Sequence, residues 1–311
     1  MVMKRGCVIG YDINEKGCQI SYYDDSMEEP DTMMASSNNY LIPLVLGYFK
    51  DRWVFGKEAK RLAVVGEDCT ETDLYGKAKR REKVSLAGKT YDAVWLLAKY
   101  ISLTLQDFEN IQYLTFTTPE TDVDMAKMLK GIGQHIGVDK EIINVQDYKE
   151  SFCQYMIFQP KELWQYESAL FYCDEDRIKA YMLRRLRVDA SHGMNSFVTV
   201  DEVANAQRKE LEALYPIMNK EKSPDESFKS MIENVFEKKV ISSVYLTGEG
   251  FEKNWYPNSL RVLCNGRRAF MGNNLYSKGA CYKSIRKCES NDDGPIYLDE
   301  TKLTERICLR M

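Results

Sequence analysis

Two short stretches of the sequence place an aspartate at the tip of a strand-like apolar run. Asp12 follows the run CVIGY, and Asp174 follows LFYC. In both places a short turn and a second strand-like run come next, which is the pattern of a β-hairpin. Carboxylates at such tips can hold a hydrated metal ion beside a phosphate group. An ordinary acidic hairpin turn explains the same residues, so both interpretations stay open.

Histidine and cysteine chemistry is poorly supported by the sequence. The only histidines, His135 and His192, have no metal-ligating neighbour at helical spacing, which argues against a zinc site or a histidine-based triad. The nine cysteines are scattered, odd in number and without a CxxC pair. Most lie inside apolar runs, as expected for reduced, buried thiols of a cytoplasmic protein.

Charge and hydropathy exclude two kinds of partner. The net charge is −4, and the basic run at 77–83 (KAKRREK) has no aromatic residues within it. We therefore interpret this run as a solvated loop and expect no nucleic-acid partner. The longest apolar stretches, 41–49 and 94–105, are shorter than the roughly 20 residues that cross a bilayer. No membrane segment is expected.

The elements around Asp12 alternate between strands and helices. Strand-like segments CVIGYDI, CQISYYD, YLIPLVLGYF and RWVFGKEA come first. Apolar spacing then predicts a helix over 91–106, a strand over 112–118 and a helix over 122–135. Thr121 and Asp124 have the spacing of a capping box for the second helix. The strand EIINVQ ends this half.

The elements around Asp174 repeat the same plan. A polar helix is predicted over 201–219, and a second one begins at Ser223, which has the character of an N-cap. The buried strand VISSVYLTG follows, then a strand over 259–264 and a helix after Gly272. Each half therefore reads as β-β-β-α-β-α.

Strands that feed helices and return to strands predict an α/β fold with mixed sheets. The repeat suggests two lobes, over 1–150 and 151–288. Residues 289–311 read as the start of a C-terminal extension that is cut short.

Several segments occur in the order of a known superfamily. These are GYDINEKGCQIS, IPLVLGYFKDRWVFGKEAKR, TFTTPETDVDMAKMLKGIGQHIGV, INVQDYKESFCQYM, LFYCDEDRIKAYML and SSVYLTGEGF. Over residues 6–285 the chain resembles the actin, sugar-kinase and heat-shock-chaperone ATPase superfamily, and most of all a bacterial actin-like or chaperone-like branch. This resemblance implies a two-lobed fold of duplicated ribonuclease H-like units.

The resemblance also implies ATP and Mg²⁺ as cofactors, held between the lobes. It places Asp12 and Asp174 at the two aspartates that hold hydrated Mg²⁺, and Glu150 on the helix between the lobes, positioned to orient water. Further ligand contacts fall on Asn14, Lys16 and Gly17 for the phosphates, on Thr247, Gly248, Glu249 and Gly250 for adenosine, and on Gly279 and Ala280 of the next helix.

The hairpins depart from that pattern. A phosphate cradle needs glycine amides and hydroxyl donors. The first turn has one glycine, Gly17, and carries Glu15, while the second has no glycine and carries Glu175 and Asp176. Carboxylates near a triphosphate oppose its binding, although Lys16 and Arg177 could act as cationic replacements. The span before Gly248 is also short, which indicates a reduced outer subdomain.

Three functions stay open from the sequence. The first is a protein that binds a nucleotide and hydrolyses it weakly or not at all. The second is a pseudo-ATPase scaffold that acts through an unidentified protein partner. The third, a small-molecule kinase, needs a substrate-facing aspartate. Asp147 is the candidate, although a residue in that place is more often a helix cap.

Overall fold

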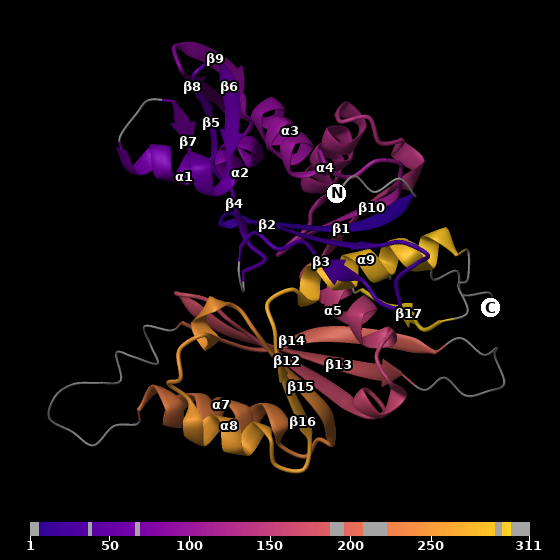
Figure 1. The fold of residues 1–311 in the computed structure, drawn as a ribbon. Coiled ribbons are helices and arrows are strands. Elements are labelled where there is room, and N and C mark those ends of the chain that lie inside the picture. Colours follow the sequence, from indigo (N-terminus) through magenta and orange to yellow (C-terminus); the bar gives the residue numbers. More distant parts are fainter. Residues whose placement is uncertain are drawn as a thin grey trace, which may run out of the picture. The chain divides into compact units, whose positions relative to one another are not determined.

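Figure 1 shows the computed structural model of the chain as helices and strands. The described residues are 6–36, 39–65, 69–186, 196–207, 223–289 and 294–299. They form a mixed α/β fold, which confirms the α/β class expected from the sequence. The chain divides into two compact units: Met1–Ser151 with Tyr276–Asp292, and Phe152–Leu275 with Asp293–Met311.

The unit boundaries differ from the expected ones, 1–150 and 151–288. Helix α9 (Leu275–Cys288) groups with the first unit except for its first residue. Strand β17 (Ile296–Tyr297) belongs to the second unit, whereas the sequence suggested a separate extension from residue 289. Each unit is therefore discontinuous in sequence.

The main sheet of the first unit has the strand order β11-β10-β1-β2-β3. Its strands are β1 (Cys7–Ile13), β2 (Gly17–Tyr23), β3 (Asp31–Thr32), β10 (Ile111–Thr118) and β11 (Ile143–Asp147), and β4 (Ile42–Pro43) also pairs with β2. β1 is antiparallel to β2 and parallel to β10, which is parallel to β11. The chain therefore continues from β1 to β2 and β3 on one side of β1, and it later adds β10 and β11 on the other side of β1.

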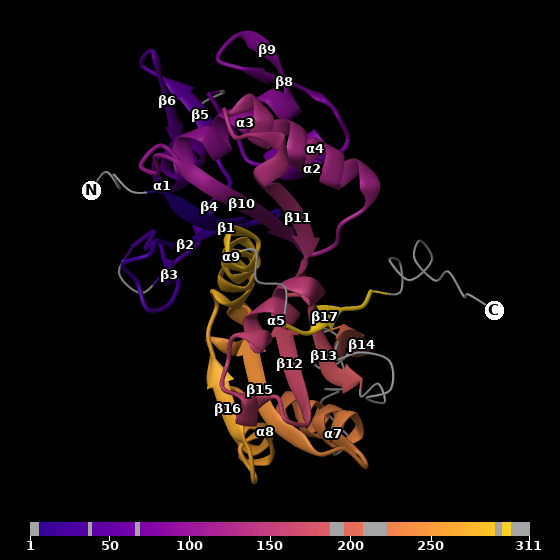
Figure 2. The same cartoon turned by 90° about the vertical axis from the view of Figure 1, so that its right-hand side faces the viewer.

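Helices α3 (Ala93–Thr104) and α4 (Val123–His135) cover one face of this sheet (Figures 1 and 2). Alternate residues of β1, including Ile9 and Ile13, are fully buried in the core on this face. This alternation follows from the period of two in a strand, which sends successive side chains to opposite faces.

Aspartates begin both helices. Asp92 caps α3, and the Asp122 carboxylate accepts the Met125 amide at the start of α4 (2.7 Å). The capping box expected at Thr121 is therefore wrong. Its hydroxyl donates to the carbonyl of Gln146 instead (3.2 Å).

Helix α9 covers the opposite face of the sheet (Figure 2). Small and hydroxyl-bearing residues, among them Gly10, Thr115 and Ser284, lie at this contact. A Cβ atom on Gly10 of β1 would lie 2.1 Å from the Ser277 carbonyl oxygen and 2.2 Å from the Cys281 amide nitrogen. Thr115 and Ser284 share a hydrogen bond between their hydroxyls (2.8 Å). The backbones of β1 and α9 approach this closely only because residue 10 has no side chain.

A smaller region lies between β3 and α3 in the sequence. It contains β5 (Leu46–Phe49), β6 (Arg52–Phe55), β7 (Thr70–Glu71), β8 (Lys83–Leu86), β9 (Lys89–Asp92), α1 (Gly56–Val65) and α2 (Leu74–Lys79). The basic run at 77–83, expected as a loop, instead spans the end of α2 and the start of β8. Lys77 pairs with Glu71 (2.8 Å) and Arg80 with Asp73 (2.9 Å), so acidic neighbours offset part of its charge.

The main sheet of the second unit has the order β16-β15-β12-β13-β14-β17. The strands not yet named are β12 (Glu167–Cys173), β13 (Arg177–Leu186), β14 (Phe197–Gln207), β15 (Ile241–Thr247) and β16 (Arg268–Met271). The polar helix expected over 201–219 is wrong for 201–207, because these residues pair with β13. Residues 208–219 lie outside the described residues.

Helices α7 (Pro224–Phe236) and α8 (Pro257–Leu263) cover one face of this sheet (Figures 1 and 2). Ser223 caps α7 in a capping box, as predicted. The strand expected over 259–264 is wrong, since most of it forms α8. Asp225 stabilises the start of α8 by accepting the amides of Asn258 and Ser259 (both 2.8 Å).

The two main sheets share one plan. In each, a central strand has two parallel neighbours on one side and an antiparallel hairpin partner on the other. The two sheets therefore repeat one order of strands, although two elements predicted for the second half, the helix over 201–207 and the strand over 259–264, are wrong. The remaining helical segments are α5 (Tyr148–Ile157), η1 (Lys140–Ile142), η2 (Lys161–Leu163) and η4 (Glu249–Phe251).

Helix length and polarity bear on whether the chain could span a membrane. Within the part of the chain that the structure describes, every helix is too short or too polar to span a bilayer.

Candidate functional site

A row of buried polar side chains crosses the first sheet at the carboxyl end of β1. Gln19, Asp12, Thr117 and Gln146 are neighbours in register on β2, β1, β10 and β11. Their exposed fractions are 8%, 4%, 0% and 3%. The chain departs from β1 in one direction and returns on the other, so the row lies at the topological switch point, where open α/β sheets bind ligands.

Asp12 is held by a tyrosine of helix α5. The Tyr148 hydroxyl donates to Asp12 Oδ1 (2.8 Å) and accepts from Asn14 Nδ2 (3.0 Å). The Tyr148 ring stacks on Tyr276 of α9, with ring centroids 3.7 Å apart and planes 6° apart. Hairpin, helix and central strand are thus joined through one phenol group.

Burial raises the pKa of Asp12 from 3.8 to about 7, and the hydrogen bond from Tyr148 opposes this shift. A carboxylate removed from water loses hydration that one phenol donor does not replace. Asp12 is therefore the strongly perturbed acid of the row, as is common at functional sites.

Ser151 links the other end of the row to helix α5. Its hydroxyl shares a hydrogen bond with Thr117 (2.6 Å) and accepts one from Gln146 Nε2 (2.7 Å). Gln19 Oε1 and Gln146 Oε1 are buried and accept no hydrogen bond from the described residues. Such acceptors are few in folded proteins and point to a bound water or ion.

The donor chemistry of the row fits a hard cation. Asp12 supplies a carboxylate, of which Oδ1 is engaged by Tyr148, and Gln19 beside it supplies a neutral oxygen. No group of three or more His, Cys, Asp or Glu side chains converges within the described ranges. Mg²⁺ would therefore be held at Asp12 mainly through water.

Glu150 lies in the first turn of α5. The Asp147 carboxylate accepts its amide (2.8 Å), so Asp147 caps this helix, the more common role of a residue in that place. The Glu150 carboxylate pairs with Lys283 of α9 at 2.9 Å, and their side chains are 8% and 23% exposed. This ion pair joins α5 to α9 and occupies the carboxylate expected to orient water.

The first hairpin turn uses its own side chain to satisfy its amides. Asn14 Oδ1 accepts the amides of Lys16 (2.9 Å) and Gly17 (3.3 Å). A Cβ atom on Gly17 would lie 2.3 Å from the carbonyl oxygen of Ile42, so strand pairing with β4 explains this glycine. The Lys16 side chain is exposed.

The second hairpin turn has the same arrangement with a charged side chain. Asp174 Oδ1 accepts the amides of Asp176 (2.7 Å) and Arg177 (2.8 Å). Successive amides of this kind are the donors that cradle phosphate oxygens. In this turn a carboxylate of the chain itself already takes them.

Backbone pairing fixes which residues of the two hairpins correspond. The amide of Asn14 donates to the carbonyl of Gly17 (3.0 Å), and the amide of Asp174 donates to the carbonyl of Arg177 (3.1 Å). In each turn this bond joins residues that are three positions apart, so Asp174 corresponds to Asn14.

This register changes the expected pairing of the two aspartates. The counterpart of Asp12 is Tyr172, two residues before Asp174. Asp12 and Asp174 therefore do not hold equivalent places. The two hairpins look alike in sequence because each apolar run is followed by an aspartate, but these aspartates lie at different distances from the turn.

The turn assigned to adenosine is packed against its own unit. Gly248 has φ = 100°, and a Cβ atom there would lie 2.1 Å from the Cys173 carbonyl oxygen. A Cβ atom on Gly250 would lie 2.3 Å from Cys173 Sγ. Thr247 is the buried last residue of β15. The glycines thus allow close contact with the end of β12, which explains them without a ligand.

Gly279 has a similar explanation. A Cβ atom on this residue would lie 2.0 Å from the Ser151 carbonyl oxygen, so the glycine permits α9 to touch the start of α5. Ala280, beside it, is fully buried. Both residues serve helix packing within the first unit.

Comparison with known proteins assigns the chain to a family. Residues 29–300 match the family described as "Family of unknown function (DUF5716) C-terminal". The chain belongs to the DUF5716 C-terminal family. A search of curated proteins gave no match.

The matched range of the DUF5716 C-terminal family covers only part of the candidate site. Thr117, Gln146 and Tyr148 lie inside it, whereas Asp12 and Asn14 lie before its first residue. The second hairpin is wholly inside. In this member of the family, the polar row combines strands that lie before residue 29 with strands that lie inside the matched range.

Sequence reasoning missed most of the polar row in this DUF5716 C-terminal family member. Gln19, Thr117 and Gln146 each lie within two residues of the strand end that borders the row. Polar residues at neighbouring carboxyl ends of parallel strands were the available signal. Tyr148 gave no such signal, because its role depends on where α5 begins.

Proposed function

We propose that the chain is a pseudo-ATPase scaffold with the architecture of the actin, sugar-kinase and chaperone ATPase superfamily. It acts through contacts with a protein partner and not through ATP hydrolysis. One observation carries this proposal: in both hairpin turns, the amides that would cradle phosphate are taken by Asn14 or Asp174 of the same turn.

The electrostatics support loss of phosphate binding. A phosphate oxygen would have to displace the Asp174 carboxylate from two short hydrogen bonds and then lie beside it. Hydrogen bonds to charged acceptors are about twice as strong as neutral ones, and two like charges 4 Å apart repel by about 4 kcal/mol at an effective dielectric of 20. Both effects favour the closed turn.

The architecture is supported by the two matching sheets. Each has a central strand at the switch point between a hairpin and a parallel pair, as in duplicated ribonuclease H-like units. Six of the eight described cysteines are buried, and none of the eight is in a disulfide, which supports a reducing compartment such as the cytoplasm.

A second candidate, nucleotide binding with Mg²⁺, is favoured by the polar row alone. Asp12 is buried with a raised pKa, and Gln19 Oε1 beside it accepts no bond from the described residues. Mg²⁺ would supply charge neutralisation for phosphoryl transfer to water. Asp12 would hold its water shell, and Lys16, exposed at the turn, would pair with a phosphate.

The test is a thermal-shift titration of the chain with ATP, ADP and GTP, each with and without Mg²⁺. Ligand at about 100 times its dissociation constant would stabilise the fold by about 2.7 kcal/mol, so binding is readily detected. We expect no Mg²⁺-dependent shift up to millimolar nucleotide.

Two variants separate the candidates. If Mg²⁺–ATP does stabilise the chain and Asp12→Asn abolishes that shift while Asp174→Ala keeps it, nucleotide binding at the polar row replaces the scaffold proposal.

Asp174→Ala alone also tests the closed turn. Freeing the two amides should leave nucleotide affinity unchanged or increase it, and a loss would show that Asp174 contacts the ligand.

A further inference from the structure

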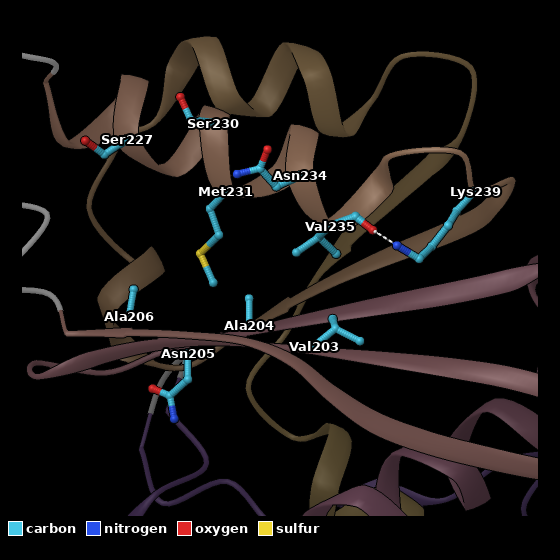
Figure 3. Close-up of a pocket in the computed structure, with 10 residues that line it drawn as sticks. All are labelled: Val203, Ala204, Asn205, Ala206, Ser227, Ser230, Met231, Asn234, Val235 and Lys239. Atoms are coloured by element: carbon cyan, nitrogen blue, oxygen red, sulfur yellow. Dashed lines mark hydrogen bonds between the residues drawn. The ribbon is translucent and has the colours of Figure 1, made fainter.

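A groove opens between strand β14 and helix α7 of the second unit (Figure 3). Its volume is about 490 Å³, within the usual range of ligand pockets, about 300–1,000 Å³. Val203 and Ala204 line it from the strand, and Met231 and Val235 line it from the helix. The floor is therefore apolar.

The rim of the groove is polar and mostly uncharged. Ser227, Ser230 and Asn234 of α7 lie along it. The Ser227 hydroxyl is buried and makes no hydrogen bond to any residue that the structure describes. Lys239 is the cation of the lining, and its ammonium donates to the Val235 carbonyl (2.6 Å; Figure 3).

The outer edge of β14 already accepts a strand at one end. The amides of Ile296 and Leu298 donate to the carbonyls of Ser196 and Val198, both at 2.9 Å. This parallel pairing with β17 covers only Phe197 and Val198. Between Thr199 and Ala206, the edge has no strand partner among the described residues.

The direction of the backbone groups follows from this pairing. The backbone carbonyl of Val198 points toward β17. Backbone groups point to alternate edges along a strand, so those of Val200 and Glu202 point to the same edge as those of Val198. The register with β13 then shifts, and Val203 is the extra residue of a bulge. Bulges re-aim neighbouring side chains, and this one lies where the strand enters the groove.

We propose that this edge and groove bind an extended segment of a partner protein by strand addition. The segment would pair with β14 beyond β17 and place an uncharged aliphatic side chain on the floor formed by Ala204 and Met231. Ser227 would donate to the bound segment and lose its unpartnered state. Main-chain bonds would supply affinity and the groove would supply selectivity. The proposal is independent of any nucleotide.

The probe is a phage-displayed library of random dodecapeptides, selected on the whole chain. Selected peptides should carry an aliphatic residue within an extended, uncharged core. Ala204→Trp fills the groove and should weaken their binding at least about tenfold, equivalent to 1.4 kcal/mol. Val123→Trp is the matched control, because Val123 is 67% exposed on a helix of the other unit and should leave binding unchanged.

A second measurement does not depend on the folding of any variant. The best synthetic peptide should lose binding when alternate backbone amides are N-methylated, since strand addition needs them. Hydrogen exchange should show new protection over 199–207. Equal binding to Ala204→Trp, tolerance of N-methylation, or protection elsewhere overturns the proposal. Dimerisation through this edge also overturns it, because the occupant is then a second copy of the chain. Peptide binding only after removal of residues 300–311 overturns it as well, because the occupant is then the chain itself.

Discussion

The two main sheets have the same strand order but differ in the row that borders the hairpin turn. In the first unit this row contains Gln19, Asp12 and Thr117. The corresponding positions of the second unit are Lys179, Tyr172 and Thr247. A buried carboxylate in one sheet thus corresponds to an aromatic ring in the other.

The two sheets thus share a backbone plan without sharing the side chains of this row. A pair of equivalent aspartates would give a symmetric clamp for a metal ion, and this chain has one aspartate at that level. In the second hairpin, Asp174 lies two positions further on, where it accepts the amides of its own turn. Of the two corresponding rows, the one in the first unit therefore holds the buried carboxylate with a raised pKa.

The contact between β1 and α9 provides the largest expected change in the free energy of unfolding. Gly10→Val in β1 should destabilise the fold by about 4 kcal/mol or more, because its Cβ atom meets two backbone atoms of α9 that cannot move aside. Gly131→Ala in α4 is the control, since a Cβ atom there meets nothing within 4 Å. It should stabilise by about 0.5–1 kcal/mol. Urea unfolding measures both, and equal stability of the two variants would contradict the close packing.

Removing the buried charge comes next. The folded-state pKa of Asp12, about 7, lies above its ordinary 3.8, so the folded chain binds this proton more tightly than the unfolded chain. Its contribution is fully present below about pH 4 and is lost as the pH rises to about 7. Asp12→Asn should therefore raise the free energy of unfolding at pH 8 by up to about 4 kcal/mol.

The matched variant in the other hairpin is Asp174→Asn, which should change stability by no more than about 0.5 kcal/mol. Urea unfolding of both variants at pH 5 and pH 8 decides the matter. The comparison fails if Asp12→Asn and the unmodified chain have the same stability at pH 8.

The ion pairs of the two units should differ as well. Lys283→Met removes the ammonium group that pairs with the buried Glu150 carboxylate, and we expect a loss of about 3 kcal/mol. Arg184 of the second unit pairs with Glu167 and Asp201 while 37% exposed, so Arg184→Met should cost about 1 kcal/mol or less. Chemical denaturation gives both values, and a larger loss for Arg184→Met would reverse this ranking.

The turn residues give the smallest effect. Asn14→Ala removes two amide bonds and the bond to Tyr148, and should cost about 1–2 kcal/mol. Asp174→Ala removes two amide bonds in a half-exposed turn and should cost about 1 kcal/mol. Differential scanning calorimetry can rank them, and a greater loss at Asp174 would mean that the second turn is the more rigid one.

Local patterns predicted the elements better than the site. The strand from Ile111 to Thr118, the helix from Ala93 to Thr104 and the cap at Ser223 follow from spacing and residue type alone. The segment 201–207 did not, because its polar residues suit a helix surface, and only pairing with β13 makes it a strand. Tertiary contacts decided against local preference there.

The candidate site depended on register, which the sequence does not display. Asp12 was found because it stands out at the end of an apolar run, but its partner Tyr148 lies 136 residues away. Glycines at 248, 250 and 279 suggested space for a ligand, and close backbone contacts fill that space instead. A glycine marks close approach without saying what approaches.

The discontinuous first unit has a consequence for synthesis on the ribosome. Its sheet and the helices of its apolar face are complete once residue 151 has emerged, yet the helix that covers Gly10 begins only near residue 276. At about 5–20 residues per second, the polar face waits for about 6–25 s before its own chain can cover it. During that interval β1 and its neighbours lack the helix that covers their polar face, so completion of the first unit depends on a segment that is synthesised after most of the second unit.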